Sequence, residues 1–152
     1  MENIVFDSGV KEYRINGTGV LRFNPGDPNL YARFLDALDK VKALEKELAD
    51  KAREAETSAA ENGEAVLRLM QDADRRIKAV LTEVFGAGND FDQALGGVNL
   101  LAVAQNGERV LTNLLAALQP VLVAGAESYA RQQADMAVAE ADRQRAKRGA
   151  TA

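Results

Sequence analysis

Hydrophobic and polar residues alternate near the start of the chain with the period of a β-strand. Tyr13 and Ile15 alternate with charged or polar neighbours, and Leu21 and Phe23 flank an arginine. A period of two is typical of a strand with one buried face. Residues 16–19, NGTG, separate the two runs and tolerate the backbone angles of a tight turn. The pattern predicts an antiparallel hairpin with one apolar face.

A shorter apolar run, Ile4 to Phe6, precedes a turn signal at residues 7–9, DSG. We predict a strand here as well, which gives a sheet of two or three strands. Such a small sheet is not stable alone. Its apolar face is therefore expected to cover the helical core or to dock against a neighbouring copy, and its exposed edge is a place where another chain can pair.

From residue 27 onward the hydrophobic period becomes that of a helix. Asp27 is a favourable N-cap, and Pro28 suits the first helical turn. Apolar residues then recur three or four positions apart, which places them on one stripe: Leu30, Phe34, Leu38, Val41, Leu44 or Glu45, and Leu48. Residues 49–65 carry only alanine, small and charged residues, with Asn62-Gly63 as the predicted interruption. This segment is either a solvated helical extension or a hairpin tip.

The next helix has the most regular apolar seam of the chain, with the spacing of a coiled coil: Val66, Met70, Ala73, Ile77, Val80 and Val84. Two acid–base pairs four residues apart, Asp72–Arg76 and Asp74–Lys78, are expected to support its outer face. Gly86 is placed to end the helix. We therefore predict that residues 27–85 form an antiparallel αα-hairpin.

Glycine and asparagine dominate residues 86–107, which predicts a loop with a short helix around Asp90–Leu95 and a turn at Asn106-Gly107. A long helical run follows. Pro120 removes a backbone donor within it, so the helix is predicted to kink or split there. Beyond Glu127 the apolar pattern thins, and the polar end is expected to fray after about Arg143.

These elements predict a single domain of the α+β class that is mainly α. Its expected parts are a β head at 1–26, a helical hairpin at 27–85, a glycine-rich loop with a short helix at 86–107, and kinked C-terminal helices at 108–148. A length of 152 residues suits one such domain.

Composition argues against an enzyme. The chain contains no His and no Cys, so it lacks the commonest general base, the commonest metal ligand and any thiol. None of its serines, Ser8, Ser58 and Ser128, lies in a nucleophile motif. The GAGND stretch at 86–90 follows a helix, whereas phosphate-binding loops follow a strand. We predict no catalytic residue, no cofactor-binding residue and no metal ligand.

The net charge of −4 and the distribution of cations argue against nucleic acid as a partner. The basic cluster at the end, Arg143 to Arg148, is better explained as cations at a helix C-terminus. The segment from Val110 to Ala126 carries no charge, but it is at the short limit for a membrane span and contains polar residues. A buried or partner-facing helix is preferred there.

The apolar surface of this last segment is larger than a chain of this size can be expected to cover. Such an excess often marks an interface, so interface and core both stay open as interpretations. The predicted partner-binding residues are Val110, Leu111, Leu114, Leu115, Leu118, Val121 and Leu122.

Three stretches carry a resemblance to a known family: FDSGVKEYRING with VLRFNPGDPN at 6–29, LTEVFGAGNDFDQALGGVNLLAVAQNG at 81–107, and LLAAL at 114–118. They resemble a family of small tail-morphogenesis proteins of tailed phages and prophages. The head motif is the specific part, and the helical middle is not. The sequence departs from the family pattern at 95–99, LGGVN.

The resemblance implies a tail assembly chaperone-like protein of the host cytoplasm. Such a protein binds the long helical tape measure protein and protects its apolar surface before the tail tube forms. A homo-oligomer is expected, and the resemblance supplies no catalytic residues. The alternative is a structural virion component of the tail or connector.

Overall fold

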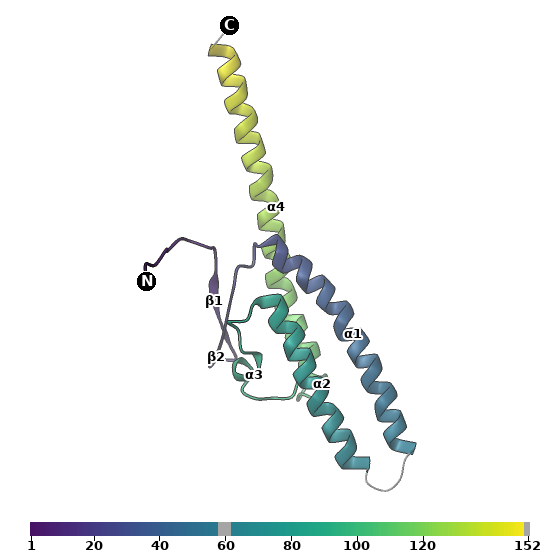
Figure 1. Cartoon of the computed structure of the whole chain (residues 1–152). Coiled ribbons are helices and arrows are strands. Elements are labelled where there is room, and N and C mark those ends of the chain that lie inside the picture. Colours follow the sequence, from purple (N-terminus) through teal and green to yellow (C-terminus); the bar gives the residue numbers. More distant parts are fainter. Residues whose placement is uncertain (58–61, 151–152) are drawn as a thin grey trace.

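A computed structural model describes residues 1–57 and 62–150 of the chain (Figure 1). The protein is mainly helical and begins with a two-stranded antiparallel sheet, so the predicted α+β class is confirmed. In chain order the elements are β1 (Lys11–Ile15), β2 (Gly19–Phe23), α1 (Pro28–Thr57), α2 (Asn62–Phe85), α3 (Phe91–Ala94) and α4 (Val110–Ala150).

The predicted hairpin forms with the expected apolar face. Tyr13 lies opposite Leu21 in the strand register. Leu21 and Phe23 are buried, while Tyr13 and Ile15 are half-buried against the same core. The ring of Tyr13 stacks on that of Phe23, with 4.5 Å between the centroids. The turn is tight because Asn16 adopts a φ of 48° and the glycine after it a φ of 83°.

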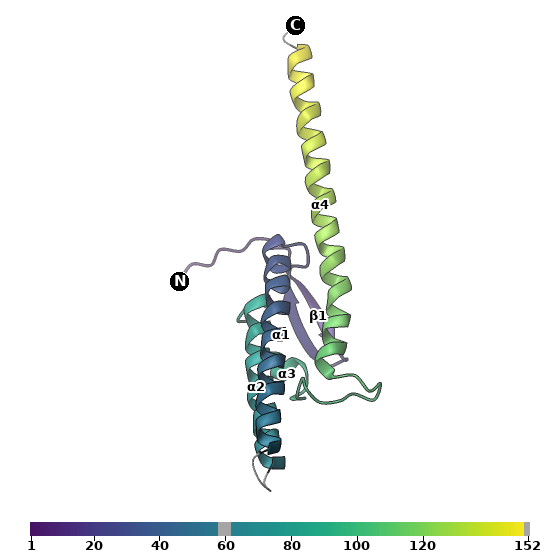
Figure 2. The same ribbon diagram turned by 90° about the vertical axis from the view of Figure 1, so that its right-hand side faces the viewer.

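The predicted strand at Ile4–Phe6 is wrong. Residues 1–10, the N-terminal arm, form no strand and are exposed throughout. Figures 1 and 2 show the arm leading away from the body and from α4. Its apolar residues have strand propensity, but a strand needs a partner edge, and within the described chain the arm lies beside none.

Helices α1 and α2 pack as the predicted antiparallel hairpin (Figure 1). Asp27 caps α1, since its carboxylate accepts a hydrogen bond of 2.9 Å from the backbone N–H of Asn29. Gly86, with a φ of 109°, follows the end of α2. The interruption predicted at Asn62-Gly63 is misplaced, because both residues belong to α2. Helix α1 extends to Thr57, and residues 58–61 lie outside the described part.

The two helices of the hairpin are also joined by exposed ion pairs. The guanidinium of Arg76 on α2 donates two hydrogen bonds, of 3.2 and 3.0 Å, to the carboxylate of Glu47 on α1. Lys51 lies 2.9 Å from the same carboxylate. These hydrogen bonds, first from Arg76 and then from Lys51, lower the pKa of Glu47 to about 2.

Acid should therefore weaken the helical hairpin through Glu47. Because the folded-state pKa lies below the unfolded value near 4.5, the contribution is complete above about pH 4.5 and is lost as the pH falls toward 2. Urea unfolding at a series of pH values should show a shallower acid dependence in Glu47→Gln than in the wild type. Glu127→Gln should keep the wild-type slope, because Glu127 is exposed on α4 and pairs with no cation in the part of the chain that the structure describes. Equal slopes for all three proteins would contradict the assignment.

Helix α4 corrects two predictions. It is one helix of 41 residues with Pro120 inside it, and Figures 1 and 2 show no break. Pro120 and Ala116, the residue whose carbonyl loses its helical donor, are both exposed, so water can satisfy that carbonyl. The helix also continues to Ala150, past the predicted fraying point at Arg143.

The buried side chains form one hydrophobic cluster, to which β2, the four helices and the loop before α4 contribute. Only the first part of α4 takes part in it. Its last buried residue is Leu122, and from Glu127 to Ala150 every residue is exposed. The second part of α4 therefore extends from the body as an isolated helix (Figure 1).

Candidate functional site

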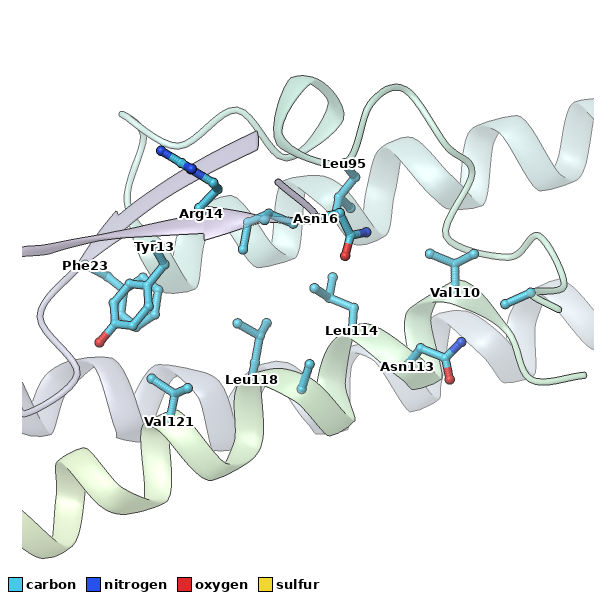
Figure 3. Close-up of a pocket in the computed structure, with 13 residues that line it drawn as sticks. Tyr13, Arg14, Asn16, Phe23, Leu95, Val110, Asn113, Leu114, Leu118 and Val121 are labelled. Carbon is cyan, nitrogen blue, oxygen red and sulfur yellow. The ribbon is translucent and has the colours of Figure 1, made fainter. Parts of the chain in front are cut away.

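An apolar groove separates the sheet from the first part of α4 (Figure 3). One wall is the apolar face of the hairpin and the other is α4, and the volume between them is about 540 Å³. We call this cavity the α4 groove. Its lining residues are Tyr13, Arg14, Ile15, Asn16, Phe23, Leu95, Ala104, Val110, Asn113, Leu114, Ala117, Leu118 and Val121.

The structure divides the seven predicted partner-binding residues into two groups. Four of them line the α4 groove, and in Figure 3 they follow one another along α4: Val110, Leu114, Leu118 and Val121. Steps of four and three residues keep them on one helix face. Leu111 and Leu122 are each only 1% exposed and belong to the core. Leu115 packs against the core without lining the groove.

The residues of α4 that line the groove differ in how much of each side chain is exposed to it. Leu114 and Leu118 are 8% and 6% exposed, so they contribute to the core and only their outer atoms reach the groove. Val110 and Val121 are half-buried at its two ends. Substitutions at Val121 therefore test the groove with the least damage to the fold.

The opposite wall of the α4 groove was not part of the predicted site. It comes from Tyr13, Ile15 and Phe23, with Leu95 from the glycine-rich loop. The alternating pattern had assigned an apolar face to the hairpin. The pattern does not show that this face is directed toward α4, because that depends on how α4 docks.

The groove continues along α4 toward the protruding part of the helix. A second hollow of about 890 Å³ shares Tyr13 and Val121 with the first. Its lining is more polar and comes from the base of the N-terminal arm, residues 24–28 and the α4 stretch from Ala124 to Gln132. We call this hollow the polar extension.

One asparagine fixes the sheet to the end of α2. The side-chain Oδ1 of Asn89 accepts a hydrogen bond of 2.8 Å from the backbone N–H of Arg22. Its Nδ2 donates to the carbonyl oxygens of Arg22 and Phe85, both at 2.9 Å. The side chain thus pairs with β2 as a neighbouring strand would, and it sets the position of the hairpin opposite α4.

The glycine-rich loop is held by a buried lysine, which corrects another prediction. Asp74–Lys78 was expected on the outer face of its helix, but both side chains are buried. Lys78 Nζ donates to Asp74 at 2.9 Å, to Asp92 at 2.6 Å and to the carbonyl of Val98 at 2.9 Å. The second oxygen of Asp74 accepts the backbone N–H of Leu100 at 2.8 Å.

Lys78 has a structural role, because its charged ammonium group holds the glycine-rich loop against α2. Burial, the largest effect, lowers the pKa of Lys78, but the hydrogen bonds that its ammonium group donates to Asp92 and Asp74 outweigh burial, so the pKa lies above the ordinary value. All three N–H donors of the ammonium group have protein acceptors. Within residues 1–57 and 62–150, no group of three or more acidic side chains is placed to hold a metal ion.

Helix α4 is long and apolar enough in its first part to cross a membrane, by length and composition alone. Among the described helices it is the one that meets this criterion. Core helices of soluble proteins meet it too, and the same stretch of α4 supplies Leu111 and Leu122 to the core.

No protein-family model, curated protein or solved structure matches this chain. Any assignment of function therefore depends on the geometry of the groove and on the sequence motifs.

Proposed function

We propose that this protein is a tail assembly chaperone-like factor of a tailed phage or prophage, which acts in the host cytoplasm. In this proposal it binds a long helical partner of the tape measure type through the α4 groove and performs no catalysis. The observation that carries the proposal is the groove itself, an apolar cavity lined by four of the seven residues predicted to bind a partner.

The groove has the properties that an amphipathic helix requires. Its walls are mostly aliphatic and aromatic, and four of its lining residues follow one face of α4. A helix can insert residues spaced three and four apart into such a groove without any chemical step. The resemblance of the head motif to tail-morphogenesis proteins supplies the identity of the partner.

Co-expression with a fragment of the tape measure protein tests this function. We expect a soluble complex with the wild type and a several-fold lower recovery with Val121→Asp, because a carboxylate without a partner is unfavourable in an apolar interface. Val138→Asp is the matched control, since Val138 lies on the same helix, is 61% exposed and is remote from the groove lining. Far-UV circular dichroism should show equal helicity in all three proteins.

Two results would contradict the proposal. One is a fragment whose solubility is the same with and without this protein, with no co-purification. The other is equal recovery with Val121→Asp and Val138→Asp, which would place binding away from the α4 groove.

A structural virion component is the second candidate. The observation that favours it is the second part of α4, from Glu127 to Ala150, which is exposed on all sides. A helix that is polar on all sides either bridges between separate bodies or is supported by pairs along its own surface, and bridging is the role expected in a permanent assembly. Mass spectrometry of purified particles beside the cell lysate separates the candidates, because a virion component persists in particles and an assembly chaperone does not.

A further inference from the structure

The two edges of the small sheet differ in whether their outward backbone groups are hydrogen-bonded. On β2, the backbone N–H and C=O of Arg22 both bond to the side chain of Asn89, so they point away from β1. In an antiparallel ladder the direction of these groups alternates between successive pairs. Because Glu12 lies opposite Arg22 and Arg14 opposite Val20, the backbone groups of Glu12 and Arg14 point outward from β1.

The outer edge of β1 is free. Within the described residues, no donor or acceptor meets the outward N–H and C=O groups of Glu12 and Arg14. Tyr13 and Ile15, on the same strand, line the α4 groove. A further strand added at this edge would therefore place every second side chain over the groove.

The N-terminal arm of this same chain has the composition of such a strand. Ile4, Val5 and Phe6 are 86%, 83% and 77% exposed, which is an unusual state for three consecutive large apolar residues. In an extended arm Ile4 and Phe6 share one face, and Val5 lies on the other.

Charges on the arm and on β1 are complementary. Among the described residues, Lys11 and Arg14 on β1 have no ion-pair partner, and neither have Glu2 and Asp7 on the arm. Arg14 also lies at the lip of the α4 groove, as Figure 3 shows. The third charged residue of β1, Glu12, already pairs with Arg22 at 3.1 Å, so a strand from the arm would bring its two acids to an edge that carries Lys11 and Arg14.

We propose that the N-terminal arm of one copy adds as a third strand to the free edge of β1 in a second copy, with Ile4 and Phe6 closing the α4 groove. A second copy is the donor because the arm, whose base lines the polar extension of its own chain, then leads away from its own groove. The side chain of Asn24 donates to the carbonyl of Ser8 at 3.2 Å, and Gly9 donates to the carboxylate of Asp7 at 2.9 Å. Both views show the arm leaving away from α4 (Figures 1 and 2).

This inference does not rest on the proposed function, because self-association is measured without any other protein. The arm and a helical partner would meet the same groove. Variants that release the arm should therefore keep or increase recovery of the tape measure fragment. If self-association is not observed, the proposed binding of the tape measure fragment is unaffected, and if the fragment is not bound, the proposed self-association is unaffected.

Sedimentation velocity of the full chain over a concentration series tests the arm. The wild type should associate, and Phe6→Asp should weaken association about 30-fold or more, since it removes a large apolar side chain from the interface and buries a charge. Val5→Asp is the matched control on the other face of the same strand and should have a several-fold smaller effect. Both variants lie in an exposed arm, so the fold should be unchanged. A monomeric wild type, or equal effects of the two substitutions, would overturn the proposal.

The acceptor edge is tested separately. Arg14→Pro removes an outward N–H of β1 without removing a hydrogen bond of the hairpin, and proline is tolerated on a sheet edge. It should weaken association about tenfold, whereas Val20→Pro, which removes an outward N–H of β2, should not. The amides of Glu12 and Arg14 should exchange with solvent more slowly as protein concentration rises. Amide protection that is independent of protein concentration would show that the arm closes on the groove of its own chain, and it would overturn the proposed pairing between two copies.

Discussion

Replacing Asp74 by alanine should lower the free energy of unfolding by about 3 kcal/mol. The substitution leaves the ammonium group of Lys78 buried with only the exposed carboxylate of Asp92 as an ionic partner. It also leaves the buried backbone N–H of Leu100 without its acceptor. Removing one member of a buried ion pair is costly because the other charge stays desolvated.

The matched control for this prediction is Asp72→Ala, two residues earlier on the same helix. The side chain of Asp72 is 53% exposed, and its partners Arg75 and Arg76 lie at 3.6 and 4.0 Å. An exposed pair of this kind contributes at most about 0.5 kcal/mol. Urea denaturation followed by far-UV circular dichroism should separate the two variants clearly. Equal stabilities would contradict the burial of the Asp74–Lys78 pair.

This pair shows where sequence reasoning ends. Asp72–Arg76 and Asp74–Lys78 have the same residue types and the same spacing, so the local pattern predicts the same exposed role for both. What distinguishes them is the glycine-rich loop, which folds over α2 and brings Asp92 and Val98 to Lys78. That contact depends on the path of a loop, and loop paths have no hydrophobic period to read.

The elements that were predicted correctly are those whose signals are local. The hairpin with its turn, the cap at Asp27 and the end of α2 at Gly86 follow from residues within a few positions of each other. The prediction of a strand at Ile4–Phe6 was wrong because such a strand depends on a signal that is not local. Its propensity is local, but the edge with which it would pair is not.

The candidate groove was predicted in part for the same reason. Periodicity identified an apolar stripe on α4, and a stripe has two flanks. When α4 docks, one side of the stripe, with Leu111 and Leu122, is buried in the core. The other side, with Val110 and Val121, faces the groove beside the sheet. Only the position of α4 against the sheet decides which flank is which, and that position depends on a close contact at Gly125.

Substituting Gly125 by alanine should destabilise the protein by about 1–3 kcal/mol and shift α4 away from the head. A Cβ at this position would lie 1.8 Å from the carbonyl oxygen of Pro25 and 2.4 Å from its carbonyl carbon. Backbone atoms cannot move aside as a flexible side chain can. The helix itself must therefore shift, and Leu122, only 1% exposed, must lose core contacts.

The sign of this effect makes the test decisive, because alanine is intrinsically favoured over glycine within a helix by about 1 kcal/mol. Gly149→Ala on the same helix meets nothing within 4 Å, so it should leave the melting temperature unchanged or raise it slightly. Gly125→Ala should lower the melting temperature instead, in thermal unfolding followed by circular dichroism. If both variants melted at or above the wild-type temperature, α4 would not be docked on residues 24–26, and the α4 groove would lose the wall that defines it.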